Sequence, residues 1–507
     1  MFIRQKKNKS GSTSVQIISK SSGKYQVVKT IGSSFDNSVI EELKIHGKQE
    51  IERLKSQLGL FVFENDSFVE RSFSELGNAS VRTIGPELIF GKIYDSIGFG
   101  AVKEELFRHL VISRLAFPLS KLKTVDYLYR YQGVSIGINQ VYRFLDKLNS
   151  KLQSQVEQIA FSHTLKTLQG QINIVFYDMT TLYFESSDED DLRKAGFSKD
   201  GKHSNPQIFL GLLVGLGGYA IGYDIYEGNI SEGGTLIPFI EKIRRKYNLG
   251  KPVIVADSGL LSNKNIQSLF AMGYHYIIGS RMKNESAIIK RQILATKLSD
   301  GQTICITKND GNRLIVSYSS SRASKDAHNR QRGLQRLEKQ IKTGKLTKSS
   351  INNKGYNKYL TMTGEVTITI DYNQYQADEC WDGLKGYITN TDLKDKEVIE
   401  NYGNLWFIEK AFRMSKTDLR IRPIYHRLRS RIEAHICISF VSYCIYKELE
   451  RVLYLEKSEL SINTASEITH NMYEVTFMLP QSRQMKSILL KMDQKQAQLF
   501  KIIQKYF

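Results

Sequence analysis

The runs Ile172-Asn-Ile-Val-Phe-Tyr-Asp178 and Pro252-Val-Ile-Val-Ala-Asp257 decide the fold of this chain. Both runs are short, apolar and rich in β-branched residues, which is typical of buried strands. Each run closes on an aspartate, so a carboxylate is expected at the end of each strand. A third carboxylate, Glu409, lies in a stretch with helical spacing between Tyr402 and Lys416. Three carboxylates presented from two strands and one helix can hold two hard divalent ions.

The segment around these runs alternates between strand and helix patterns. Strands are expected at 172–178, 207–216, 219–227, 252–257 and 274–279, and helices at 234–247 and 262–272. Three consecutive strands followed by helix and strand repeats predict a mixed α/β sheet. Gly215–Gly218 falls between two strands with no helix after it, which favours a hairpin turn over a phosphate-binding loop.

The rest of the chain is expected to divide around this sheet. The predicted regions are an N-terminal hairpin plus a mostly helical, DNA-binding region (1–165), a catalytic core (166–283 and 384–450), a β-rich insertion (284–383) and a helical C-terminal region (451–507). In the last region, Pro480 is expected to begin an amphipathic basic helix that runs to Phe507, because proline suits the first turn of a helix.

The charge of the chain indicates a polyanionic partner. The 507 residues carry a formal net charge of +20, and the pI is about 9.4. Nucleic acid is the expected partner of so basic a chain, and the alternative is a generally basic, well-solvated surface. Together with the carboxylates, this charge predicts an enzyme that cuts DNA.

The cysteines and the apolar runs indicate the compartment. No C-x-x-C pair occurs among the four cysteines, so a zinc ribbon is not expected, and Cys437 and Cys444 are predicted to be buried thiols. The basic N-terminus has no apolar segment after it, and no apolar run approaches the ~20 residues of a membrane span. We therefore expect a cytoplasmic, nucleoid-associated protein without a membrane partner.

Two helical segments are candidates for DNA contact. A helix over 124–131, a break at Gly133 and a helix over 138–148 outline a helix-turn-helix, in which Arg143 could read bases or phosphates. The alternative is an ordinary helical hairpin with a solvated polar face. The basic segment 322–342 carries Arg332 and Arg336 and could lie along a phosphate backbone. Its apolar residues Leu334, Leu337 and Ile341 indicate a packing face, and both roles are compatible.

The spacing around the third carboxylate resembles a known signature. The frame reads Tyr402-x2-Leu405-x3-Glu409-x6-Lys416. It is similar to the Tyr-x2-Arg-x3-Glu-x6-Lys signature of DDE insertion-sequence transposases of the IS-four-like group, except that Leu405 occupies the arginine position. Further ordered resemblances are Tyr177-Asp-Met-Thr-Thr, Gly196-Phe-Ser-Lys-Asp-Gly, Val255-Ala-Asp-Ser-Gly-Leu, Arg422-Pro-Ile-Tyr-His426 and Arg431-Ile-Glu-Ala-His435.

The resemblance implies a ribonuclease H-like core and Mg²⁺-dependent cleavage and strand transfer at the ends of an insertion sequence. Asp178, Asp257 and Glu409 would be both the catalytic residues and the metal ligands, with Mn²⁺ as a substitute for Mg²⁺. Residues with an expected role in DNA binding are Tyr402, Arg413, Lys416, Arg143, Arg332, Arg336 and His426. The implied partners are double-stranded DNA with terminal inverted repeats and target DNA, bound by a homodimer.

Two other functions fit the sequence. One is a non-catalytic DNA-binding repressor derived from a transposase, which metal-dependent nicking would exclude. The other is a ribonuclease H-like nuclease that cuts without joining, which a strand-transfer product would exclude.

Overall fold

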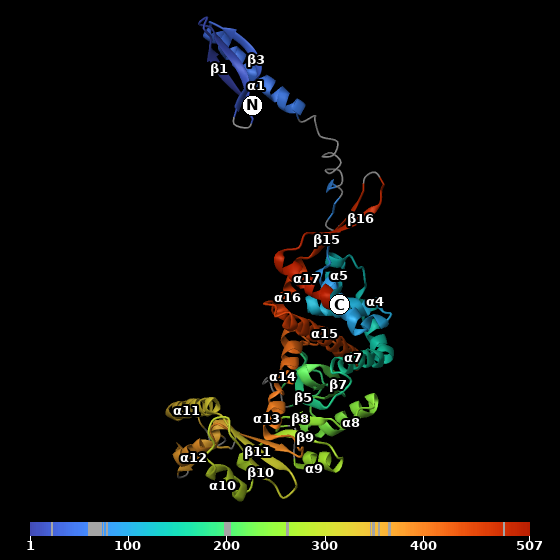
Figure 1. Cartoon of the computed structure of the whole chain (residues 1–507), viewed down its shortest axis with the longest axis vertical. Coiled ribbons are helices and arrows are strands. Elements are labelled where there is room, and N and C mark those ends of the chain that lie inside the picture. The colour runs from blue at the N-terminus through green and yellow to red at the C-terminus, as the bar shows by residue number, and fades with distance from the viewer. Residues whose placement is uncertain are drawn as a thin grey trace. The chain divides into compact units, whose positions relative to one another are not determined.

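The computed structural model describes residues 1–21, 24–58, 73–74, 76–77, 80–196, 204–259, 263–344, 346, 350–352, 355–363, 367–479 and 482–507. The chain forms two compact units (Figure 1). Unit 1 comprises Met1–Val81 and Glu474–Leu489, and unit 2 comprises Arg82–Tyr473 and Leu490–Phe507. The finer division into regions predicted from the sequence stays a prediction.

Unit 1 contains an antiparallel sheet with one long helix. The sheet is formed by β1 (Phe2–Lys7), β2 (Thr13–Ser21) and β3 (Lys24–Ser34), and the helix is α1 (Asn37–Leu58). The predicted hairpin is confirmed as β2 and β3, and β1 adds a third strand on the other side of β2. Val15, Ile17 and Ile18 are buried. A Cβ at Gly32 would lie 2.8 Å from a Leu43 methyl carbon, so the missing side chain lets α1 pack closely on the sheet.

The C-terminal region departs from the predicted helix. The described elements are α16 (Ile462–Ile468), β15 (Tyr473–Met478), β16 (Met485–Leu489) and α17 (Gln494–Tyr506). The expectation of one helix from Pro480 is wrong, because β15 and β16 pair as antiparallel strands. Pro480 itself lies outside the described residues. Asp493 caps α17 by accepting a hydrogen bond from the Gln496 amide at 2.8 Å.

An eight-stranded mixed sheet forms the centre of unit 2, consistent with a ribonuclease H-like core. Its strand order is β10-β11-β14-β9-β8-β5-β6-β7. The bounds are β5 (Ile174–Tyr183), β6 (Gln207–Val214), β7 (Ala220–Glu227), β8 (Val253–Ala256), β9 (Tyr276–Ser280), β10 (Thr303–Thr307), β11 (Arg313–Tyr318) and β14 (Leu384–Thr389). The pairs β5–β8 and β8–β9 are parallel, whereas β5–β6, β6–β7 and the β9–β14–β11–β10 pairs are antiparallel. The predicted mixed α/β sheet is confirmed.

Alternating side chains divide this sheet into two apolar faces. Val175 and Tyr177 belong to the core under α8 (Leu236–Tyr247) and α9 (Asn263–Ala271). Phe176 and Val255 belong to the larger core on the other face. Because successive side chains of a strand point to opposite faces, each residue's face follows from its position in the strand.

Helices cover the larger core. The first group is α3 (Lys92–Ile97), α4 (Glu105–Ala116), α5 (Lys121–Gln132), α6 (Ile138–Lys147) and α7 (Gln153–Thr167), and the second is α13 (Asp395–Gly403), α14 (Trp406–Arg413) and α15 (Arg429–Leu455). The long helix α15 packs against α4, α6 and α7 and is buried along most of its length, including Cys437 and Cys444 as predicted. Among the described helices, none combines the length and apolarity needed to cross a membrane.

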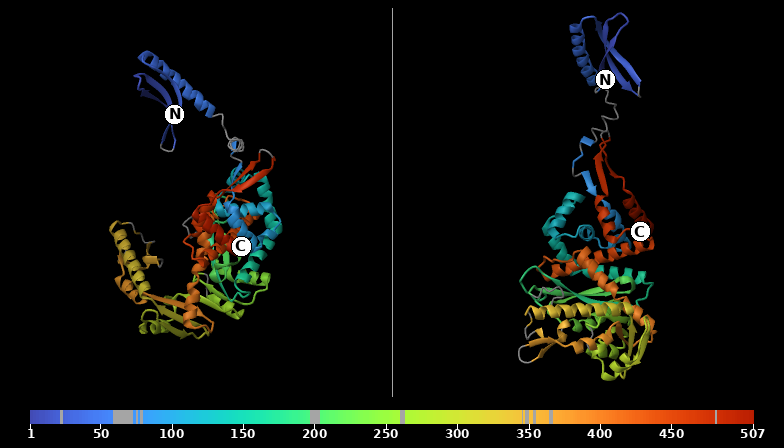
Figure 2. Two further views of the ribbon diagram at one scale, coloured as in Figure 1. Left: turned by 45° about the horizontal axis from the view of Figure 1, so that its top comes forward. Right: turned by 90° about the vertical axis from the view of Figure 1, so that its left-hand side faces the viewer.

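The segment between β9 and β14 contains more helix than strand. It holds α10 (Ala287–Ala295), β10, β11, α11 (Ser320–Lys342), β12 (Leu360–Thr363), β13 (Thr367–Ile370) and α12 (Tyr372–Ala377). Strands β10 and β11 continue the central sheet, whereas β12 and β13 pair separately beside α11. Figures 1 and 2 show the part containing α11 and α12 extending to one side of the sheet.

Candidate active site

Asp178 and Asp257 lie next to each other on neighbouring parallel strands. The register pairs Tyr177 with Ala256, so the residues that follow them continue side by side. The expectation that Asp178 closes its strand is wrong, because β5 continues to Tyr183. Asp257 does follow the last residue of β8 directly, as predicted. Neighbouring strands are about 4.8 Å apart, so the two carboxylates are brought close together.

Strand alternation places both aspartates on the face of the larger core. Asp178 is two residues from Phe176, and Asp257 is two residues from Val255, and both of these apolar residues belong to that core. Helix α14, which carries Glu409, packs on the same face against β5 and β6. The ring centroids of Phe407 and Phe176 lie 6.1 Å apart in an edge-to-face arrangement. All three predicted carboxylates therefore come from elements that share one face of the sheet.

The carboxylates differ in their hydrogen bonding. Asp257 Oδ1 accepts hydrogen bonds from the Ser258 amide at 2.7 Å and from the Tyr402 hydroxyl at 3.1 Å, and within the described part of the chain Oδ2 has no hydrogen-bond partner. Asp178 Oδ1 accepts from the Met179 amide at 2.7 Å. Glu409 is exposed, and although Arg413 lies one helical turn away, no ion pair joins these two described residues. Oxygen atoms of Asp257 and Glu409 are thus available to a ligand.

The pKa values of two residues, Tyr402 and Lys385, are affected by the charges of both Asp257 and Glu409. The Tyr402 side chain is buried on α13, and Gly279 makes room for it, because a Cβ there would lie 2.5 Å from the Tyr402 hydroxyl. Burial, then the negative charge of Asp257 and more weakly that of Glu409, raise the pKa of Tyr402, so the hydroxyl stays protonated and donates. Lys385 on β14 lies with Nζ 4.5 Å from the centre of the Tyr402 ring.

Lys385 is a residue that the sequence analysis missed. Burial and the nearby Arg322 lower its pKa, and the charges of Asp257 and Glu409 oppose that shift. The charges of both carboxylates therefore act on the Lys385 ammonium, although Asp257 and Glu409 are far apart in the sequence. The pattern of β14 alternates as in any strand, so no sequence signal distinguished Lys385 from an ordinary surface lysine.

The described residues do not form a closed metal cluster. No group of three or more His, Cys, Asp or Glu side chains in the described part of the chain is placed to hold a metal ion. The donor chemistry nevertheless suits a hard divalent ion, since carboxylate oxygens are the ligands that Mg²⁺ prefers. Mg²⁺ keeps several water ligands, so one or two carboxylates per ion are sufficient.

The residues predicted to bind DNA lie in several places. Arg413 ends α14 and is exposed, and Lys416 follows in the next turn (Met414–Asp418). Arg143 is exposed on α6, whereas Gln140 of that helix caps its own N-terminus at the Gly137 amide, and Lys147 pairs with Glu104. Their roles in DNA binding stay predictions.

On α11 the two proposed roles fall on different faces. Arg332 and Arg336 are exposed, whereas Leu337 is buried beside β12 and β13. Arg330 is also buried, and it pairs with Asp382. The helix therefore has a packing face, and its exposed face carries Arg332 and Arg336, which form no ion pair with any described residue.

His426 is partly buried, whereas Trp406 is exposed. Burial, then the charges of Lys121, Arg114 and Arg431, lower the pKa of His426 to about 4, so its imidazole is neutral near pH 7. Trp406 is 48% exposed, and Lys410 Nζ lies 5.3 Å from its ring centre.

Residues 169–445 match the family described as Transposase DDE domain. The matched range is more than half of the 507-residue chain. The chain belongs to this family. The matched range includes Asp178, Asp257, Tyr402 and Glu409, and it ends within α15. DDE transposases generally use divalent metal ions, as the resemblance of the sequence had implied.

The cryo-EM structure of a piggyBac transposase synaptic complex with hairpin DNA is similar to this chain with a TM-score of 0.38 and 10% sequence identity, over 76% of each chain. No curated protein matches the sequence.

Proposed function

We propose that this DDE transposase cleaves DNA at the ends of an insertion sequence and joins the freed ends to target DNA. The observation that carries the proposal is the common face of the elements that hold Asp178, Asp257 and Glu409, where the Tyr402 hydroxyl donates to Asp257. A scaffold protein would have no need to present three carboxylates in this way.

The three carboxylates would hold Mg²⁺ or Mn²⁺. A bound pair of such ions activates the attacking oxygen and stabilises the leaving oxygen of a phosphodiester. In the cleavage step a water oxygen forms a bond to phosphorus, and the bond from phosphorus to the 3′ oxygen breaks. In the joining step the freed 3′ hydroxyl is the nucleophile, and a target-strand 3′ oxygen leaves. Lys385, Arg413 and Lys416 would attract the phosphates, and Tyr402 fixes the orientation of Asp257.

We infer further that the chain is related to the IS-four-like group, with a departure at Leu405. That residue is only 8% exposed and belongs to the main core. A DNA contact from this position is therefore replaced by one from a neighbour. Lys410 is paired with Glu450, which leaves exposed Arg413 as the better candidate.

The expected partners are duplex DNA with terminal inverted repeats and a target duplex, bound by a homodimer. The net charge of +20 supports a polyanionic partner. Exposed Arg143, Arg332 and Arg336 are the candidate phosphate contacts outside the carboxylate face.

The deciding experiment uses a plasmid that carries the DNA flanking the gene. We expect Mg²⁺-dependent breaks at the repeat ends, and a reduction of this cleavage by about 10²- to 10³-fold in Asp178→Asn, Asp257→Asn and Glu409→Gln, as for removal of groups that act on the transition state. DNA binding should persist in all three variants. Full cleavage by a folded variant would remove that residue from the active site.

The same experiment separates the alternatives. Strand-transfer products exclude a nuclease that only cuts. Binding at the ends without breaks in Mg²⁺ or Mn²⁺ would favour the non-catalytic repressor.

A further inference from the structure

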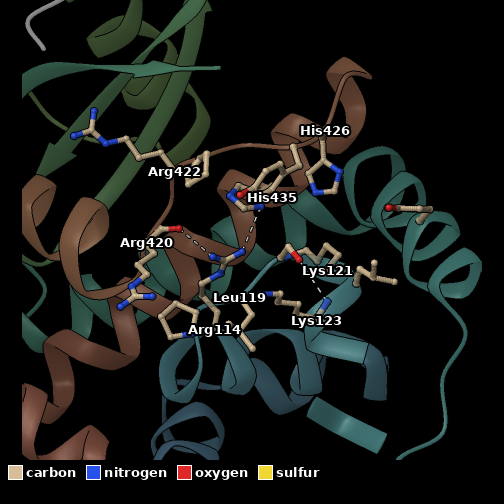
Figure 3. Close-up of a pocket in the computed structure, with 14 residues that line it drawn as sticks. Arg114, Leu119, Lys121, Lys123, Arg420, Arg422, His426 and His435 are labelled. Carbon is tan, nitrogen blue, oxygen red and sulfur yellow. Dashed lines mark hydrogen bonds between the residues drawn. The ribbon is translucent and has the colours of Figure 1, made fainter. Parts of the chain in front are cut away.

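A cationic cavity lies at the N-terminus of α5. It has a volume of about 430 Å³ and is bounded by the segment Pro118–Lys123 and by the loop that joins the α14 region to α15 (Figure 3). Its lining includes Arg114, Lys121 and Lys123 and contains no aspartate or glutamate. The carboxylate face of the sheet contributes no residue to it.

The loop side of the cavity is held in place by buried polar contacts. Arg114 Nη1 donates to the carbonyl of Arg420 at 3.1 Å, and Arg114 Nη2 lies 3.5 Å from His435 Nδ1. His435 Nε2 donates to the Ile421 carbonyl at 2.9 Å. Figure 3 shows the guanidinium of Arg114 directed at Arg420 and His435. The positive charge of Arg114 is therefore fixed beside the cavity by carbonyl oxygens, which do not neutralise it.

The buried ammonium of Lys121 has no partner among the described residues of the chain. Its side chain is 6% exposed and lines the cavity, yet within the described part of the chain its ammonium has no hydrogen bond or ion pair. Burial and the charge of Arg114 lower the pKa of Lys121. Burial of an unpaired ammonium is unfavourable, and a bound anion would offset that cost.

The N-terminus of α5 also favours a bound anion at this cavity. Lys121 is the first residue of this 12-residue helix, and Ser120 caps it by accepting a hydrogen bond from the Lys123 amide at 3.4 Å. Amide groups and the helix dipole at such an N-terminus favour an anion. His426 and His435 also line the cavity, where burial, and then the charges of Arg114 and Lys121, lower the pKa of both imidazoles.

We propose that this cavity binds a phosphate group, supplied by the backbone of a DNA strand. The assignment of the phosphate to DNA rests on the proposed function, whereas the anion site itself does not. Phosphate combines the charge and the several acceptor oxygens needed to satisfy Lys121, the helix N-terminus and the cation at the rim, Lys123. The site would hold DNA at a distance from the bond that is cut.

The first test measures thermal unfolding of the full chain in inorganic phosphate and in chloride at equal ionic strength. We expect phosphate to raise the unfolding temperature of the wild type, because a ligand that binds the folded state stabilises it. Lys121→Met removes the charge but keeps the length. It should unfold at the wild-type temperature or above it in chloride, and should lose the response to phosphate.

The second test measures binding of an arbitrary 30-base-pair duplex at several salt concentrations, without Mg²⁺ and in the Asp257→Asn background, so that cleavage plays no part. We expect Lys121→Met and Lys123→Gln each to reduce the slope of log affinity against log salt by about one phosphate contact. The matched control is Arg245→Gln, an exposed cation of α8 that does not line the cavity.

Each outcome is decisive. Loss of both responses supports the site with DNA as the source of the phosphate. Loss of the phosphate response with unchanged slopes supports a site for free phosphate and overturns the assignment to DNA. An equal response to phosphate in wild type and both variants overturns the site. A lower unfolding temperature of Lys121→Met in chloride, with Lys123→Gln unchanged in every measurement, would show that Lys121 has only a structural role.

Discussion

At the scale of single residues, Tyr402 shows how the fold prepares a carboxylate. Its hydroxyl donates to Asp257 Oδ1 at 3.1 Å, and its ring packs edge-on against Tyr387 with centroids 5.0 Å apart. A buried donor of this kind fixes which oxygen of the carboxylate faces outward. Tyr402 was expected from the sequence to contact phosphate, and the structure gives its hydroxyl an additional partner.

We predict that Tyr402→Phe lowers the affinity of the protein for a divalent metal ion while the chain still folds. Partners that orient a metal ligand typically contribute 10- to 100-fold to affinity, so the Mn²⁺ dissociation constant measured by calorimetry should rise by about tenfold or more. Tyr387→Phe is the control. It removes the hydroxyl of the neighbouring ring, and that hydroxyl lies 3.5 Å from Ser317 Oγ instead of contacting Asp257. Unchanged Mn²⁺ affinity together with weaker DNA binding would support the phosphate contact instead.

Leu405 gives a second prediction at this scale. Because its side chain is buried in the main core, Leu405→Arg should lower the free energy of unfolding by about 2–4 kcal/mol instead of improving cleavage. Leu405→Met preserves volume and should cost less than about 1.5 kcal/mol. Urea unfolding measures both. An arginine variant with wild-type stability and faster cleavage would show that the position faces DNA.

At the scale of elements, α11 has two faces with separate roles. Leu337 and Arg330 are buried on the side that packs, whereas Arg332 and Arg336 are exposed. Near the start of the helix, the charge of Arg322 acts on Lys385, which also feels Asp257 and Glu409. The N-terminal turn of α11 is therefore electrostatically linked to the carboxylate face.

We expect the double variant Arg332→Gln/Arg336→Gln to bind duplex DNA with a salt dependence flattened by about two phosphate contacts, at unchanged stability. Arg330→Gln breaks a buried ion pair with Asp382 and should instead lower the thermal stability. Filter binding at several salt concentrations and thermal unfolding separate the two effects. An unchanged salt slope in the double variant would remove α11 from the DNA interface.

At the scale of the whole molecule, the two units have separate hydrophobic cores. The core of unit 1 includes Val15, Ile17 and Ile18, and that of unit 2 is built around the mixed sheet and α15. Units with their own cores are able to fold independently.

A chain that lacks residues 1–58 should therefore keep the main unfolding transition within a few degrees of the full chain. Calorimetry of both chains makes the comparison. The same two chains test whether residues 1–58 contribute to DNA affinity, and the Mn²⁺ affinity of the carboxylates should be equal in both. A large fall in the main transition temperature would show that the larger unit depends on residues 1–58.

The sequence determined the local elements and the identity of the acidic residues. Apolar runs of strand length and helical spacing are local patterns, so the strands at 172–178 and 252–257 and the helix carrying Glu409 could be predicted before the structure was known. The same local signals failed over residues 485–489, where an amphipathic helix was predicted and the chain forms strand β16. There, antiparallel pairing with β15 outweighed the local preference for helix.

Only the tertiary structure decided which side chains meet. Tyr402 and Asp257 are 145 residues apart, and Arg114 and His435 are 321 residues apart, yet each pair is in contact. No local pattern encodes such contacts, because they follow from sheet register and helix packing over the whole unit. Lys385 and Lys121 look like ordinary lysines in the sequence. In the folded chain, burial lowers the pKa of both, and the charge of Asp257 acts on Lys385 as that of Arg114 does on Lys121.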